Sequence, residues 1–287
     1  MLLLAMLLVA AGPSIQAIAA QAGGTVGFAA LDLASGRSLG LHQDDPFPMQ
    51  SVFKLPIAIE VLRQVDEGKL DLDRVIALGP ADARDGSSGT LAIPSRPTIG
   101  ELLEAMVVSS DNVACDRLLA LVGGLRAVDA GIRGLGIAGI TIRFSELEMG
   151  AGKGDNTATP VAMVALLARI ARQRVGLSPV SSGRLEDLLF RVDTGPKRIK
   201  GALPAGTPVA HKTGTSRTQE GKTDATNDVG LISLPNGHRV AVAIFVHSSP
   251  ADEQTREKAI AHLARAAYDT FSVRSLRRAR GRTHQGR

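Results

Sequence analysis

The feature that most constrains the fold of this chain is a change in the spacing of its apolar residues. Between residues 49 and 192 the spacing is mostly that of buried helices, whereas after Pro208 it changes to the two-residue period of strands. Three strands are predicted there, at 209–215, 228–234 and 239–246, and Pro235-Asn-Gly237 is a strong hairpin signal between the last two. The chain therefore combines a helical block with a separate strand-rich region.

Strands are also predicted near the amino terminus, at 25–32 and 37–42, with Ala34-Ser-Gly36 as the turn between them. We therefore predict an α+β fold, an α/β sandwich in which a five-stranded, mainly antiparallel sheet is built from both ends of the chain. Terminal helices are expected to pack on this sheet, and the helical block is expected as an insertion between the second and third strands. The predicted domains are a sheet domain at 20–48 plus 193–272 and a helical domain at 49–192.

Within the helical block, capping signals mark where several helices begin. Thr98-Ile-Gly-Glu101 is a capping box, and Thr159-Pro160 places a capping residue before a proline that is tolerated in a first turn. Residues 69–97 lack periodicity and are predicted to be extended and loop-rich. Further helices are predicted from Ser51 to about Asp66, at 113–122, and, after the last strand, at 251–271.

Both termini differ from the rest of the chain in composition. Residues 1–19 begin with a Leu/Ala/Met run that is too short to span a bilayer, and they are predicted to be a signal segment cleaved after Ala11 or Ala19. Cleavage after Ala11 would retain residues 15–19 as the remnant of a first helix. Residues 273–287 carry six arginines and no acidic residue, and they are predicted to be a basic, disordered tail.

Composition limits the remaining classes of function. The net charge of +5 is more than accounted for by the tail, so a nucleic-acid partner is not expected. Aromatic residues make up only 3% of the chain and Trp is absent, which predicts an aliphatic core. The single cysteine, Cys115, excludes an intramolecular disulfide and is expected to be a small buried hydrophobe. No metal-ligand cluster or phosphate-binding loop is evident, and no metal or cofactor is predicted.

Ser51 and Lys54 form the first candidate catalytic pair. Residues three apart lie on the same face of a helix, so the lysine amine reaches the serine hydroxyl one turn back. A serine hydroxyl is a weak nucleophile until a neighbouring base activates it, and apolar neighbours favour the neutral amine that can do so. Pro56 removes one backbone donor, which predicts some distortion of the helix near the serine.

Two further motifs accompany this pair at long range. Ser110-Asp-Asn112 falls at a predicted helix-to-helix junction, and Lys212-Thr-Gly214 falls in a predicted strand. The three motifs, in this order and at intervals of 59 and 102 residues, resemble the signature of class A β-lactamases and penicillin-binding proteins. The resemblance covers about residues 23–271. Asn112-Val-Ala-Cys-Asp116 and Thr226-Asn-Asp228 also resemble the extended-spectrum branch.

The resemblance implies a role for each motif residue. Ser51 would be the acylated nucleophile and Lys54 its hydrogen-bonded partner, while Ser110 would pass a proton to the departing lactam nitrogen. Asp111 is expected to point inward and brace its loop. The substrate-binding residues implied by the resemblance are Asn112, Lys212, Thr213, Gly214 and Thr215, with the backbone N–H groups of Ser51 and Thr215 as the oxyanion hole.

The base that activates the deacylating water is harder to assign. In the resembled family it is a glutamate in an irregular loop, and Glu146 and Glu148 both lie in the corresponding stretch, 142–156. The spacing of Glu146 to Met149 favours Glu146, which we predict as the base, while the distance from Asn156 favours Glu148. Two family positions differ here, since Gly150 stands where a polar residue usually holds the water and Phe144 stands where arginine is frequent.

The resemblance therefore predicts a periplasmic or secreted serine β-lactamase that confers antibiotic resistance by hydrolysing penicillins and cephalosporins. Its partner would be the small-molecule β-lactam alone, with no stable membrane association, and the protein is expected to be a monomer. Two alternatives remain open. One is a penicillin-binding D-alanyl-D-alanine carboxypeptidase-like protein, and the other is a catalytically weak binding or sensor homologue.

Overall fold

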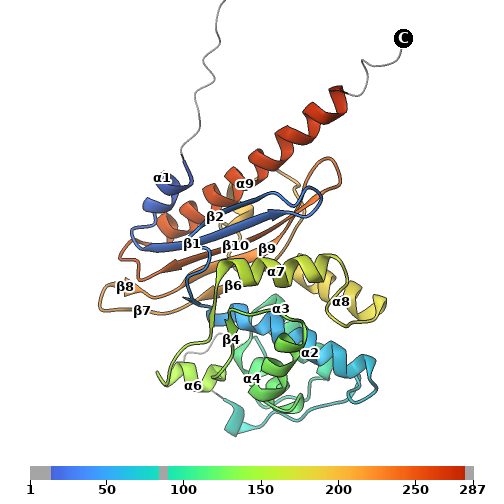
Figure 1. The fold of residues 1–287 in the computed structure, drawn as a ribbon. Helices are drawn as coiled ribbons and strands as arrows, with labels where there is room; N and C mark the ends of the chain where they lie inside the picture. Colours follow the sequence, from blue (N-terminus) through green and yellow to red (C-terminus); the bar gives the residue numbers. More distant parts are fainter. Residues whose placement is uncertain (1–13, 84–89, 282–287) are drawn as a thin grey trace, which may run out of the picture.

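A five-stranded sheet forms the centre of the molecule (Figure 1). The structure is a computed structural model and describes residues 14–83 and 90–281. All four neighbouring strand pairs in the sheet are antiparallel, in the order β2-β1-β10-β9-β6, so strands from the two ends of the chain lie side by side. The bounds are β1 (Thr25–Asp32), β2 (Ser38–Leu41), β6 (Val209–Thr215), β9 (Thr226–Ser233) and β10 (Arg239–His247). The predicted fold class and strand set are confirmed.

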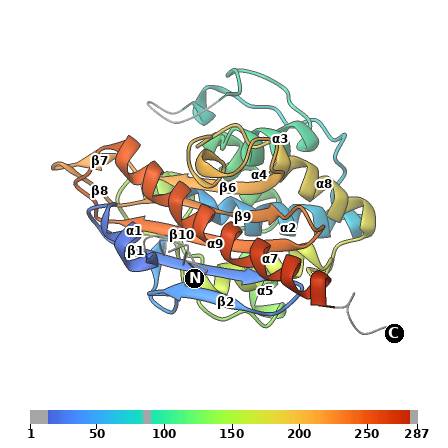
Figure 2. The same ribbon diagram turned by 90° about the horizontal axis from the view of Figure 1, so that it is seen from above.

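Helices cover both faces of this sheet. On one face lie α1 (Ile15–Ala20) and α9 (Glu253–Gly281), and Figure 2 shows α9 crossing the strands diagonally. On the other face lie α7 (Pro160–Ala171) and, against β6, α8 (Pro179–Phe190), with the other helices of the block beyond them (Figure 1). Side chains of β10 alternate between the two cores, with Val242 and Ile244 facing α9 and Ala243 and Phe245 facing the helical block. The result is a three-layered arrangement whose central strand is apolar on both sides.

The helical block is inserted between β2 and β6, as predicted, and the division into two domains stays a prediction. The Thr98–Glu101 capping box is present, since Thr98 Oγ1 accepts from Glu101 N at 3.1 Å and Glu101 Oε2 accepts from Thr98 N at 2.7 Å.

Short strands, β3 (Phe47–Pro48), β4 (Ile140–Thr141) and β5 (Thr157–Ala158), form a second small sheet, and they were not predicted. Besides α7 and α8, the helices of this block are α2 (Lys54–Asp66), α3 (Ile99–Val108), α4 (Asn112–Leu121), α5 (Leu125–Gly134) and α6 (Glu146–Gly150).

The prediction of a loop-rich segment at 69–97 agrees with the structure of its described residues. They contain the 3-10 turn η2 (Pro80–Asp82) and isolated β-bridges such as the one between Val75 and Thr98. Residues 84–89 are not among the residues that the structure describes. A further hairpin, β7 (Thr218–Gln219) and β8 (Lys222–Thr223), extends from the end of β6 and was not predicted.

The prediction for the carboxy-terminal tail is corrected in part. The last helix does not stop at Phe271 but continues to Gly281, into the segment predicted to be disordered. Residues 272–280 contain neither Pro nor Gly, and six of the nine are Arg, Leu or Ala, which have high helix propensity, so the helix has no local reason to end earlier. Residues 282–287, the rest of the predicted tail, lie outside the described part of the chain.

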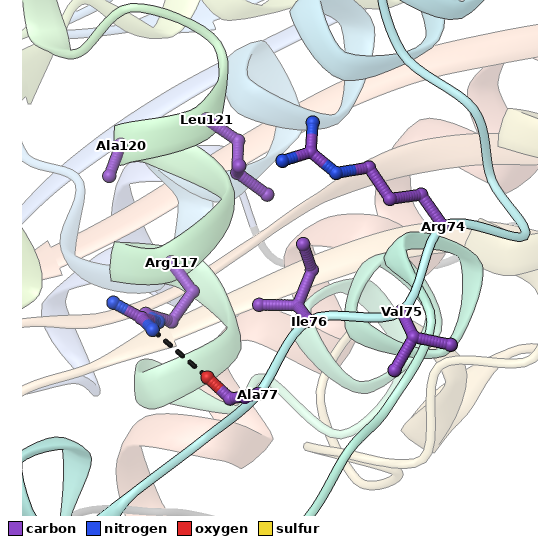
Figure 3. A pocket seen from close by; sticks show the side chains of 7 residues that line it. All are labelled: Arg74, Val75, Ile76, Ala77, Arg117, Ala120 and Leu121. Atoms are coloured by element: carbon purple, nitrogen blue, oxygen red, sulfur yellow. Dashed lines mark hydrogen bonds between the residues drawn. The ribbon is translucent and has the colours of Figure 1, made fainter.

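A groove of about 440 Å³ lies between residues 74–77 and the carboxy-terminal half of α4 (Figure 3). Arg117 Nη2 donates to Ala77 O across it at 3.0 Å. None of the predicted site residues lines this groove. Among the helices of the described residues, none combines the length and the apolar character needed to cross a membrane.

Helix α1 bears on the predicted cleavage of the amino-terminal segment, most of which lies outside the described residues. Ile18 and Ala19 are only 3% and 4% exposed, and they pack in the core formed with α9. A chain that begins at Gly12, as after cleavage at Ala11, keeps these buried residues. A chain that begins at Ala20, as after cleavage at Ala19, should be less stable by about 2–4 kcal/mol and melt about 5–15 °C lower, because it forfeits this burial.

Thermal unfolding of the two truncated chains, followed by circular dichroism, measures the difference. Equal melting temperatures for both would contradict a structural role for α1 and would remove the structural reason to prefer cleavage after Ala11.

Candidate active site

Ser51 lies in a 3-10 turn that leads directly into a buried helix. This turn, η1 (Gln50–Phe53), is followed by α2, whose first residue is Lys54. The distortion predicted near the serine is thus present, although it precedes Pro56, which sits in the first helical turn where a missing N–H costs no hydrogen bond. Lys54 Nζ lies 3.0 Å from Ser51 Oγ, as the spacing of the motif predicts.

Lys54 is fully buried and surrounded by oxygen atoms. Besides Ser51 Oγ, its Nζ donates to Ser110 O and to Asn112 Oδ1, each at 2.6 Å, and lies 3.3 Å from Ser110 Oγ. It also forms an ion pair with Glu146 Oε1 at 2.9 Å. This one amine therefore connects the first two motifs and Glu146.

The second motif occupies the tight junction between α3 and α4. Ser110 has a φ of +61°, a left-handed conformation that turns the chain sharply and places both its carbonyl and its hydroxyl against Lys54. Asp111 is buried and points inward, as predicted. It caps α4 through Ala114 N at 2.8 Å and accepts from Thr90 N at 2.6 Å, which braces the loop that follows the undescribed residues.

The third motif lies on β6, the strand at the edge of the sheet. Lys212 Nζ donates to Ser110 Oγ at 2.9 Å and to Thr213 O at 3.1 Å, so hydrogen bonds run continuously from Ser51 through Lys54 and Ser110 to Lys212. Thr213 is buried, whereas Thr215, at the end of the strand, is exposed. All three motifs meet at one place, as the sequence predicts.

Burial gives Lys212 an unusual protonation equilibrium. Desolvation, assisted by the nearby charge of Lys54, lowers the pKa of Lys212 from its ordinary value to about 7. The side chain therefore changes charge near neutral pH, which is relevant to any anionic group that binds beside it.

We expect kcat/KM for a substrate with a carboxylate to fall as pH rises through about 7. The protonated ammonium attracts the carboxylate and the neutral amine does not, and the pH profile of kcat/KM reports the free enzyme. Steady-state kinetics between pH 5.5 and 9 measure this limb. Lys212→Arg should remove it, because a guanidinium stays charged throughout this range. A wild-type profile that is flat up to pH 9 would contradict the prediction.

Glu146 is the first residue of α6 and points into the same cluster. Its Oε1 lies 3.3 Å from Ser51 Oγ and 2.9 Å from Lys54 Nζ, and the side chain is 10% exposed. Asp116 on α4 holds this short helix, because its two carboxylate oxygens accept from Glu146 N at 2.9 Å and from Leu147 N at 3.1 Å. The start of α6 is thereby fixed against α4.

Glu148 has a different environment. Its Oε2 accepts from Ser145 N at 3.0 Å and from Ser145 Oγ at 3.1 Å, which completes a capping box at the start of α6, and these hydrogen bonds lower the pKa of its carboxyl group. The stretch 142–156 is not wholly an irregular loop, because residues 146–150 are helical. Residues two apart on a helix point about 200° apart, so the two glutamates do not share a face.

Asn156 and Arg198 hold the site together and were not predicted. Asn156 is fully buried, and its Oδ1 accepts from Arg143 N at 2.7 Å while its Nδ2 donates to Phe144 O at 2.8 Å, which closes the segment that contains α6. Arg198 is buried beneath β6 and donates to Gly214 O at 3.3 Å and Asn227 O at 3.0 Å. Neither residue has a local sequence pattern that indicates its long-range contacts. For Asp116 the sequence did contain a signal, because it lies four residues after Asn112 and therefore on the same face of the helix.

Gly214 has a role in packing that was not predicted. A Cβ at this position would lie 2.3 Å from Met49 O, so the absence of a side chain allows β6 to approach the segment that carries Ser51. Its predicted role in substrate binding stays a prediction. Gly150 stands where the family usually has a polar residue. A Cβ there would have no atom within 4 Å, so the space beside α6 is open.

The remaining polar groups near the site show no metal-binding arrangement. In the part of the chain that the structure describes, no group of three or more His, Cys, Asp and Glu residues is arranged to hold a metal ion. Cys115 is buried behind Lys54, as expected of a small hydrophobe, and burial raises the pKa of its thiol well above the ordinary value.

Comparison with known proteins agrees with this geometry. The model of the beta-lactamase enzyme family matches residues 11–271. The extended-spectrum beta-lactamase PER-1 of Pseudomonas aeruginosa is 38% identical over 263 residues, which cover 88% of this chain and 84% of that protein. Beta-lactamase VEB-1 of the same organism is 35% identical over 254 residues, covering 86% of this chain and 85% of that protein.

Solved structures give the same result. A beta-lactamase from Chitinophaga pinensis superimposes with a TM-score of 0.87 at 39% identity, over 90% of this chain and 97% of that one. A class A beta-lactamase from Bacteroides cellulosilyticus superimposes with a TM-score of 0.84 at 31% identity, over 90% and 96% of the two chains. Since the match extends over nearly all of the folded chain, and the relatives are matched over most of their own lengths, this chain belongs to the beta-lactamase enzyme family, in its class A branch.

Proposed function

We propose that this protein opens the β-lactam ring of penicillins and cephalosporins by way of an acyl-enzyme on Ser51, and so confers resistance to these antibiotics. The proposal rests on the family and on the convergence of the three motifs at one site.

The acylation step requires Lys54 as a neutral amine, which takes the proton of Ser51 Oγ across 3.0 Å as this oxygen attacks the lactam carbonyl carbon. The oxyanion that forms is stabilised by the backbone N–H groups of Ser51 and Thr215. The proton then passes from Lys54 through Ser110 Oγ to the lactam nitrogen as the ring C–N bond breaks. The result is an ester on Ser51 and a protonated ring nitrogen.

The other polar side chains bind the substrate. Asn112 offers an amide to the acylamino side chain of the antibiotic, while Lys212, Thr213 and Thr215 face its carboxylate. Lys212 also donates to Ser110 Oγ at 2.9 Å, which couples carboxylate binding to the residue that delivers the proton.

In the deacylation step, Glu146 takes a proton from a water molecule as the water oxygen attacks the ester carbonyl carbon, and this proton then passes from Glu146 to Ser51 Oγ, 3.3 Å away, as the ester C–O bond breaks. The step regenerates the serine hydroxyl and the Glu146 carboxylate and releases the opened antibiotic. The single observation that carries this assignment is the position of the carboxylate, with Oε1 3.3 Å from Ser51 Oγ. A water that attacks an ester on that oxygen lies within reach of Glu146. A penicillin-binding carboxypeptidase shares the three motifs but lacks this base.

Steady-state hydrolysis of a chromogenic cephalosporin tests the proposal. We expect many turnovers per enzyme molecule. A burst of one equivalent without turnover would identify a penicillin-binding protein instead. Incubation with a labelled penicillin, followed by mass mapping, distinguishes a β-lactamase or a penicillin-binding protein from a binding or sensor homologue. The absence of an adduct on Ser51 would exclude both functions that proceed through an acyl-enzyme.

We also propose that the protein works as a monomer in the periplasm or outside the cell. The Leu/Ala-rich run at the amino terminus and the target of β-lactams, which lies outside the cytoplasm, support this location. Fractionation of expressing cells, with sedimentation analysis of the purified protein, tests the two statements separately.

A further inference from the structure

A short segment that connects α8 to η3 (Ile199–Ala202) lies against the third motif. Thr194 in this segment places its Oγ1 2.6 Å from Thr213 Oγ1, a short distance between two hydroxyl groups. Thr194 is half-buried and Thr213 is buried. The contact joins residues that are 19 apart in the sequence and that no motif relates.

Each hydroxyl has one hydrogen to donate and two lone pairs to accept with, so only one of the two threonines donates in this contact. If Thr213 donated to Thr194, it would have no hydrogen left for a substrate carboxylate, and it would present only lone pairs to an anion. If Thr194 donates, the hydrogen of Thr213 is free to point into the site. An incoming carboxylate therefore selects the arrangement in which Thr194 is the donor.

Two neighbouring contacts fix the position of Thr194. Asp193 Oδ2 accepts from Ser109 Oγ at 2.9 Å, which ties the segment to the junction that carries Ser110. Gly195 has a φ of +57°, and a Cβ there would lie 2.8 Å from Thr213 Cγ2, so only glycine lets the segment lie this close to β6. Thr194 is thus held between the second and third motifs.

We propose that Thr194 is a positioning residue for substrate recognition, which donates to Thr213 and so directs the hydroxyl hydrogen of Thr213 toward the carboxylate of the β-lactam. The inference deepens the proposed function and rests on it, because it concerns how the same site binds its substrate. Thr194 touches the substrate at no step. It acts through Thr213.

The test compares Thr194→Val, which keeps the shape of the side chain without the hydroxyl, with Thr194→Ser, which keeps the hydroxyl. Two substrates are needed, a cephalosporin with its free carboxylate and the methyl ester of the same cephalosporin. For the free acid, Thr194→Val should lower kcat/KM about fivefold to tenfold, mainly through KM, because a hydrogen bond to a charged group is weakened. For the ester the variant should resemble the wild type, and Thr194→Ser should resemble it on both substrates.

A matched control uses Thr213. Thr213→Val should show the same selective loss on the free acid, and adding Thr194→Val to it should cause little further loss, because the two residues act as one unit. Equal losses on acid and ester, or no loss on the acid, would overturn the role of Thr194 while leaving β-lactam hydrolysis intact. A wild-type protein without turnover would overturn the proposed function and this inference together.

Discussion

Replacing Glu146 with Gln is expected to slow deacylation by about 10²- to 10⁴-fold, the usual contribution of a general base. The amide has nearly the same shape as the carboxylate but does not take a proton from water. Acylation should continue, because Ser51 and Lys54 remain 3.0 Å apart. The variant should therefore accumulate an acyl-enzyme, which intact-protein mass spectrometry detects as a stable adduct after mixing with a penicillin.

The matched control is Glu148→Gln, two residues away on the same short helix. Glu148 caps α6 through Ser145, so this change should cost a fraction of the cap energy, up to about 1 kcal/mol, and leave turnover close to that of the wild type. If the adduct accumulated only in the Glu148 variant, Glu148 would be the base and the assignment of Glu146 would be wrong. Either result is compatible with the proposal that the protein is a β-lactamase.

The comparison of these two glutamates indicates what sequence reasoning could and could not reach. The three motifs were recognisable because each is a local pattern, and Ser51 with Lys54 needed only helical spacing to meet. The choice between Glu146 and Glu148 depended on the conformation of the segment that carries them. Five residues of helix, begun by the Ser145 capping box and held by Asp116, carry too little periodicity to be predicted.

The same distinction holds for the fold. Strands β6, β9 and β10 and the capped start of α3 follow from alternation and from capping chemistry, which are properties of neighbouring residues. The two-residue strands β3, β4 and β5 have no such signal, because they exist only where distant segments meet. Asn156, Arg198 and Thr194 belong to the same group, since each acts through partners more than ten residues away.

Gly214→Ala is expected to damage both the fold and the site, because it places an atom where two elements already touch. The added Cβ would lie 2.3 Å from Met49 O and 3.2 Å from Val52 N, and both neighbours are backbone atoms. Met49 has little freedom to withdraw, since its carbonyl accepts from Asn227 Nδ2 at 3.1 Å and its N–H donates to Asn156 O at 2.8 Å. The strand must therefore move away from Ser51 to relieve the contact.

A displacement of about 1 Å between β6 and η1 separates Lys212 and Thr215 from the nucleophile, and a shift of this size typically costs about 10²-fold in rate. We expect kcat/KM to fall by about this factor, and the overpacking to reduce the free energy of unfolding by about 1–3 kcal/mol. Chromogenic cephalosporin kinetics and chemical denaturation measure the two effects.

The control is Gly183→Ala in α8, where a Cβ meets no atom within 4 Å. There the same substitution should leave activity unchanged and stabilise the helix by about 0.5–1 kcal/mol. Wild-type activity in Gly214→Ala would show that the close approach of β6 to Met49 does not set the geometry of the site.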